Sequence, residues 1–68
     1  MVTGKMYSML MVMEIGKPYA EDSLIRRFSE GVFNEALDKS YIRYTGKSDE
    51  FGHRLFTLTQ LGKDARDK

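Results

Sequence analysis

Two stretches decide the fold: Asp38-Lys39-Ser40-Tyr41-Ile42-Arg43-Tyr44-Thr45-Gly46 and Arg54-Leu55-Phe56-Thr57-Leu58-Thr59-Gln60-Leu61-Gly62. Each holds a short run rich in β-branched and aromatic residues, and a polar segment ending at Gly52 separates the two runs. Such runs predict two strands joined by a loop. Alternation with a period of two puts Ile42 with Tyr44, and Phe56 with Leu58, on one face of their strands. The sequence therefore predicts a β-hairpin that follows one helix and precedes another.

Three helices are expected before the hairpin. The first runs from about Lys5 to Ile15, because apolar residues recur there at helical spacing, and Gly16 with Pro18 should end it. The second runs from Tyr19 to Phe28. Its inward residues are Leu24, Ile25 and Phe28, and the inward residues of the first helix are Met6, Met9, Leu10 and Met13.

The third helix is expected from about Glu30 to Ser40, with Ser29 as its N-cap. A tight turn should separate it from the second helix, so the two form a helix-turn-helix. Its buried stripe is Val32, Phe33, Ala36 and Leu37. After the hairpin, Thr59 can cap a short final helical turn that continues to Ala65. The fold class is therefore α+β, with three helices, a C-terminal hairpin and a last helical turn.

Size and composition limit the possible functions. The chain has 68 residues, which leaves room for one domain over residues 1–68. It contains no cysteine and one histidine, so disulfides, thiolate metal sites and cysteine nucleophiles are excluded, and we expect no metal and no cofactor. No Ser/His/Asp arrangement or phosphate-cradling loop is present, so an enzyme is not expected. The lack of cysteine fits a cytoplasmic location, and without a membrane-length apolar run a membrane protein is not expected.

The motifs that flank the hairpin resemble those of bacterial winged helix-turn-helix regulators of the MarR and PadR kind. Those families show Leu-Thr-x-x-Gly after the wing, and this chain matches at Leu58, Thr59 and Gly62. Ser40 stands where the families usually have glycine. The 68 residues end soon after this motif, so the long C-terminal helix through which those regulators dimerise is not expected. In length and element order it is also similar to short stand-alone winged-helix regulators of fimbrial operons, phages and plasmids.

The resemblance implies a DNA-binding transcription regulator. In such proteins the third helix enters the major groove and the wing contacts phosphates or the minor groove. Carried over to this sequence, the recognition-helix residues are Ser29, Asn34, Glu35 and Lys39. The wing residues are Arg43, Lys47, His53 and Arg54, and Lys63, Arg66, Arg26 and Arg27 extend that basic surface. The implied partner is double-stranded DNA.

The distribution of charge favours a second interpretation. The formal net charge is only +1, and the third helix carries Glu30, Glu35 and Asp38 but no arginine. Carboxylates that face phosphates are costly unless each one meets a base donor. The alternative is therefore a winged-helix protein-interaction module that does not bind DNA. It would use this acidic face or the Met-rich first helix, where Tyr7 and Met11 are also candidates for a homodimer surface.

Overall fold

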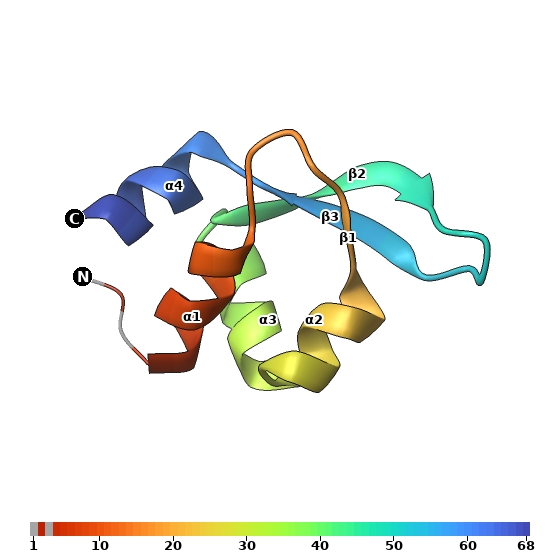
Figure 1. Ribbon diagram of the computed structural model, residues 1–68, viewed down its shortest axis with the longest axis horizontal. Helices are drawn as coiled ribbons and strands as arrows, with labels where there is room; N and C mark the ends of the chain where they lie inside the picture. The colour runs from red at the N-terminus through yellow and green to blue at the C-terminus, as the bar shows by residue number, and fades with distance from the viewer. Residues whose placement is uncertain (1, 3) are drawn as a thin grey trace.

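The computed structural model describes residue 2 and residues 4–68. In that part of the chain, helices and a small antiparallel sheet form a mixed α+β structure. Helices α1, α2 and α3 lie on one side of the sheet, α4 lies beyond one end of it, and the β2–β3 loop projects at the opposite end (Figure 1). The elements are α1 (Gly4–Val12), β1 (Tyr19–Ala20), α2 (Glu21–Arg27), α3 (Glu30–Asp38), β2 (Ile42–Ser48), β3 (Arg54–Leu58) and α4 (Gln60–Asp67).

The sheet has the strand order β1-β3-β2, so β3 is central and pairs antiparallel with both neighbours. Phe56 of β3 lies opposite Tyr19 of β1 and Tyr44 of β2. The register of β2 and β3 shifts between Tyr44 and Ser48, which is typical of a β-bulge. This shift lies on the stretch of the hairpin that carries Lys47.

The core lies between the helices and the inner face of the sheet. The apolar face predicted for the first helix is confirmed at Met6, Met9 and Leu10, and Met13 is buried as well, although it lies beyond the end of α1. Phe33 of α3 meets Phe56 of β3 edge to ring, with centroids 4.9 Å apart. The buried apolar residues are Met6, Met9, Leu10, Met13, Leu24, Phe33, Ala36, Ile42, Phe56 and Leu58.

The predicted start of the second helix was wrong. Tyr19 and Ala20 form strand β1 instead, and α2 begins at Glu21. The apolar pattern does fit a helix, but pairing with β3 satisfies backbone groups on a strand that would otherwise be a sheet edge. Long-range pairing of this kind overrides local periodicity.

The first helix is also shorter than predicted, since α1 ends at Val12 rather than near Ile15. The Tyr19 hydroxyl donates to the Val12 carbonyl (3.3 Å) and accepts from the Glu14 amide (2.9 Å). These bonds, together with a turn closed from the Lys17 amide to the Glu14 carbonyl, replace the helical hydrogen bonds.

At the other end of the chain, α4 continues to Asp67, two residues beyond the prediction.

Both predicted caps are confirmed. The Ser29 hydroxyl accepts from the Val32 amide (3.0 Å), and the Thr59 hydroxyl accepts from the Gly62 amide (3.0 Å). The third helix ends at Asp38, and Ser40 takes a left-handed conformation with φ of 62°. Ser40 thus adopts a conformation that glycine adopts more readily than serine.

Candidate nucleic-acid interface

Helix α3 exposes a polar face made of Glu30, Asn34, Glu35 and Asp38. Ser29 caps the N-terminal end of this helix, and the exposed residue Lys39 is its C-cap. Of the predicted recognition-helix residues, Asn34, Glu35 and Lys39 are therefore exposed. Ser29 is half-buried, and its hydroxyl oxygen accepts from the Val32 amide, which occupies one of its two acceptor positions.

Strand β2 carries two cations that are open to solvent. Arg43 lies opposite Thr57 in the ladder, and Lys47 lies near the bulge. Both side chains are exposed, and neither forms an ion pair with any of the described residues. An unpaired, solvated cation contacts a phosphate without first breaking an internal bond. These two residues are the hairpin cations with the most freedom to bind an external anion.

Arg54 is in a different state. Its guanidinium binds both oxygens of Glu21 at the start of α2, with an Nη2–Oε2 distance of 2.8 Å. It also lies over the rings of Tyr44 and Phe56, at 5.9 and 5.4 Å from their centroids. The hydrogen bonds from Arg54 hold the pKa of Glu21 below its ordinary value. Arg54 therefore ties the hairpin to α2, and its charge is largely satisfied within the molecule.

His53 belongs to the turn at the tip of the hairpin. Its Nδ1 lies 3.5 Å from Oδ2 of Asp49, whose other oxygen accepts from the His53 and Phe51 amides at 2.9 Å. The amide of His53, and then that of Phe51, hold the pKa of Asp49 below its ordinary value. His53 thus lies beside the carboxylate of Asp49, whereas Arg43 and Lys47 have no ion-pair partner among the described residues.

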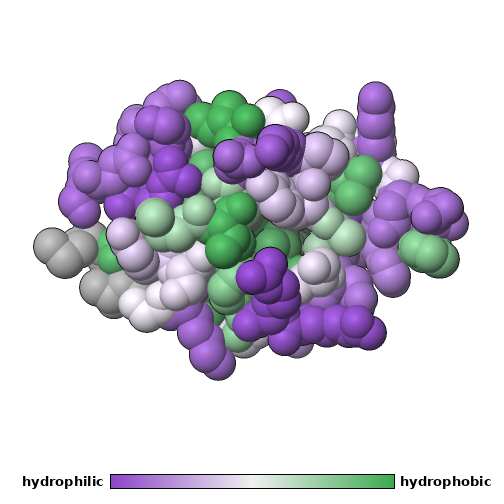
Figure 2. Space-filling view, viewed as in Figure 1, coloured by the Kyte–Doolittle hydropathy of each residue, from purple (hydrophilic) through white to green (hydrophobic). Residues whose placement is uncertain are grey.

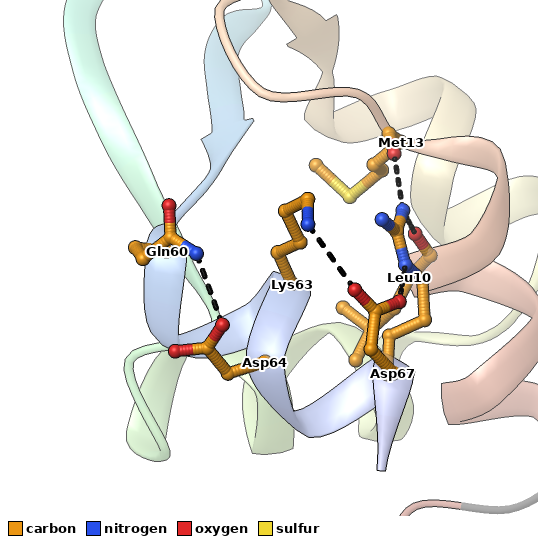
Figure 3. A network of polar contacts seen from close by, with 7 residues as sticks. Leu10, Met13, Gln60, Lys63, Asp64 and Asp67 are labelled. Atoms are coloured by element: carbon orange, nitrogen blue, oxygen red, sulfur yellow. Dashed lines mark hydrogen bonds and ion pairs between the residues drawn. The ribbon is translucent and has the colours of Figure 1, made fainter.

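The structure corrects the expected extension of the basic surface to Arg66. The Arg66 Nη1 donates to the carbonyls of Leu10 and Met13, at 3.1 and 3.2 Å, and the side chain is only 16% exposed. Figure 3 shows these contacts joining α4 to the end of α1. Arg66 thus satisfies carbonyls that the end of α1 leaves open. Lys63 pairs with Asp67 beside it (3.2 Å).

The remaining expected cations lie on α2. Arg26 pairs with Asp22 at 3.5 Å, and the guanidinium of Arg27 lies 5.3 Å from the centroid of the Phe28 ring. Both arginines are exposed. An exposed ion pair of this kind is weak, so it does not remove Arg26 from reach of an external anion.

Helix α1 presents an apolar stripe that includes the two residues expected to form a homodimer surface. Tyr7 and Met11 are 41% and 50% exposed. Beside Met11, a groove of about 430 Å³ runs between α1 and α4. Figure 2 shows apolar side chains in the middle of the face on which α1 lies, with hydrophilic ones around them. Self-association through this stripe stays a prediction.

Within residue 2 and residues 4–68, no three His, Cys, Asp or Glu side chains gather closely enough to hold a metal ion. No helix in the same part of the chain has the length and apolar character needed to cross a membrane. Comparison with family models, with curated proteins and with solved structures found no match.

Proposed function

We propose that this chain is a winged helix that binds double-stranded DNA and regulates transcription, with the β2–β3 hairpin as the wing and α3 as the recognition helix. The element order supports this assignment, because a helix-turn-helix formed by α2 and α3 leads directly into an antiparallel hairpin. A short strand between the first two helices completes the sheet. In this fold the third helix lies in the major groove and the wing lies along the backbone beside it.

The observation that carries the proposal is the pair Arg43 and Lys47. Both are exposed on β2 without an internal ion-pair partner among the described residues. Each phosphate contact contributes about −0.9 to the slope of log K against log salt. With Lys39 and Arg27 as further exposed cations, we expect about three to four contacts and a slope of about −3. On α3, Asn34 is suited to pair with adenine and Glu35 to accept from cytosine.

The test is fluorescence anisotropy with a labelled mixed-sequence duplex at about 50 and about 200 mM salt. The double variant Arg43→Ala/Lys47→Ala should reduce the slope by about 2, because two phosphate contacts are lost. The matched control is Lys17→Ala/Lys68→Ala, which removes the same charge from exposed lysines outside α3 and the hairpin. Equal losses in both variants, or no binding by the wild-type protein at low salt, would contradict the proposal.

One observation favours a second candidate, a protein-interaction module. Glu30, Glu35 and Asp38 are exposed along α3, and none has an ion-pair partner among the described residues. A basic surface on a protein partner would complement this face. Neutralising the three carboxylates should then abolish capture of the partner. If instead it leaves capture intact and strengthens DNA binding, the DNA proposal is the better account.

A further inference from the structure

The tip of the hairpin exposes a phenyl ring. Phe51 is 78% exposed, the largest exposed fraction among the large apolar side chains of the described residues. A single exposed apolar residue is ordinary on a protein surface and by itself indicates nothing. Phe51 differs in its place, because it lies at the far end of the element proposed to contact DNA.

The backbone that carries Phe51 is held in a closed turn. Asp49 Oδ1 accepts from the amides of Phe51 and His53, both at 2.9 Å, and the Asp49 amide donates to the His53 carbonyl at 2.9 Å. The Gly52 amide donates to the Asp49 carbonyl at 3.1 Å, and Gly52 has a φ of 85°, which glycine adopts without strain. The exposed ring therefore sits on a backbone that is already ordered, which reduces the entropy lost on binding.

The charges around Phe51 are mixed. Lys47 is exposed on the strand that leads to the turn, and the His53 ring lies 6.5 Å from the Phe51 ring, centroid to centroid. The Asp49 carboxylate accepts two amide hydrogen bonds within the turn, which offset part of its charge. Glu50, the other carboxylate of the turn, is exposed. An apolar ring at the tip, next to cations on β2, is the arrangement by which proteins insert a wedge between base steps in the minor groove.

We propose that Phe51 is a minor-groove wedge that partly unstacks one base step when the hairpin lies on duplex DNA. The inference rests on the proposed DNA-binding function and adds the groove and the type of contact to it. Arg43 and Lys47 would hold the hairpin on the phosphates, and Phe51 would then bend the duplex. Because Phe51 is uncharged, its contribution should not depend on salt, unlike that of the two cations.

The test uses the full chain and two variants at this exposed site. Phe51→Ala should weaken binding to a mixed-sequence duplex by about tenfold, the effect typical of losing one aromatic contact with a base. It should leave the salt slope unchanged and abolish the rise in fluorescence of a duplex labelled with 2-aminopurine, which reports unstacking. Leu61→Ala is the matched control, because it removes another exposed apolar side chain, on α4, at the end of the molecule opposite the hairpin tip (Figure 1).

The second variant, Phe51→Trp, gives a direct reading, since the chain contains no tryptophan. Its indole emission should be quenched by DNA, and acrylamide should reach it less readily in the complex. If the wild-type protein binds DNA while Phe51→Ala binds equally well and the indole stays accessible, the wedge is refuted and DNA binding stands. If the wild-type protein shows no DNA binding at low salt, both proposals fail. Loss of a protein partner in Phe51→Ala, with DNA binding unchanged, would also refute the wedge.

Discussion

At the scale of single residues, Gly62 explains why the Leu-Thr-x-x-Gly motif ends in glycine. Gly62 is buried in the first turn of α4, where its amide donates to the Thr59 hydroxyl. A Cβ built there would collide with the carbonyl oxygen of Tyr41 and lie 2.8 Å from Cδ1 of Leu58. The Thr59 hydroxyl also donates to the carbonyls of Ser40 and Tyr41, at 2.6 and 3.0 Å. The motif thus joins the start of α4 to the chain that enters β2.

Gly62→Ala should therefore destabilise the protein by at least about 2 kcal/mol, because the added methyl group meets backbone that cannot move aside cheaply. Denaturant unfolding measures the change. Gly31→Ala is the control, since an added Cβ on this exposed residue of α3 meets nothing closer than the Ser29 hydroxyl at 4.0 Å. That variant should be stabilising by about 0.5–1 kcal/mol. Equal effects of the two changes would rule out the steric explanation.

Ser40 has a strained backbone conformation. Its φ of 62° costs a non-glycine residue about 1 kcal/mol, so Ser40→Gly should raise the free energy of unfolding by about 0.5 kcal/mol after the larger entropy of unfolded glycine is subtracted. The same substitution at exposed Ser8, inside α1, should lower it by about 0.5 kcal/mol. Because the two variants should change the free energy of unfolding in opposite directions, they separate backbone strain from a general effect of glycine. Thermal unfolding of both variants measures the two changes.

Among the helices and strands, the sequence could predict the features that depend on neighbouring residues but not those that depend on contacts between distant elements. The helix stripes, the hairpin strands and the two N-caps follow local rules, and the structure confirms them at Met9, Ser29 and Thr59. Strand β1 could not be predicted, because two residues acquire strand geometry only by pairing with β3. The internal roles of Arg54 and Arg66 were missed for the same reason, since their partners lie 33 and 53–56 residues away in the chain.

The contact of Arg66 with α1 should stabilise the folded chain. Arg66→Ala should lower the free energy of unfolding by about 2 kcal/mol, because the Leu10 and Met13 carbonyls lose a charged donor. Arg66→Lys should recover only part of this loss, since a single ammonium does not present the same planar donors. Arg66 also contacts the exposed carboxylate of Asp67 at 3.1 Å. Lys63→Ala is therefore the control: it removes a neighbouring cation that contacts the same carboxylate, and it should be nearly neutral. A neutral Arg66→Ala would contradict the capping role.

The turn at the hairpin tip should depend on pH. The folded pKa of Asp49 is lowered by the His53 and Phe51 amides, so its charge stabilises the turn above the unfolded pKa of about 4. That stabilisation should be lost as the pH falls through the lowered folded pKa. The Phe51 and His53 amide resonances, followed by NMR between about pH 5 and pH 2, should report the loss. Asp49→Asn should abolish this titration, whereas Glu50→Gln should preserve it; an unchanged titration in Asp49→Asn would refute the assignment.

In the molecule as a whole, charge of opposite sign is divided between two surfaces. The net charge is only +1, yet the open cations Arg43 and Lys47 lie on the hairpin, and the carboxylates Glu35 and Asp38 lie on α3. If both surfaces face DNA, α3 opposes the binding that the hairpin supports. The recognition helix would then lower the affinity for a non-specific duplex and restrict tight binding to sequences whose bases donate to its carboxylates.

The double variant Glu35→Gln/Asp38→Asn should bind a mixed-sequence duplex about tenfold more tightly than the wild-type protein at about 50 mM salt, because repulsion from the phosphates is relieved. At about 200 mM salt the gain should be smaller, because salt already screens that repulsion. Anisotropy titrations of both proteins measure the ratio. The control Glu14→Gln/Asp64→Asn gives the same net charge by changing exposed residues outside α3 and the hairpin. A gain confined to the α3 variant would show that α3 lies close to the phosphates. Equal gains would instead mean that only the net charge matters, and no gain in either variant would indicate that this face of α3 is turned away from the duplex.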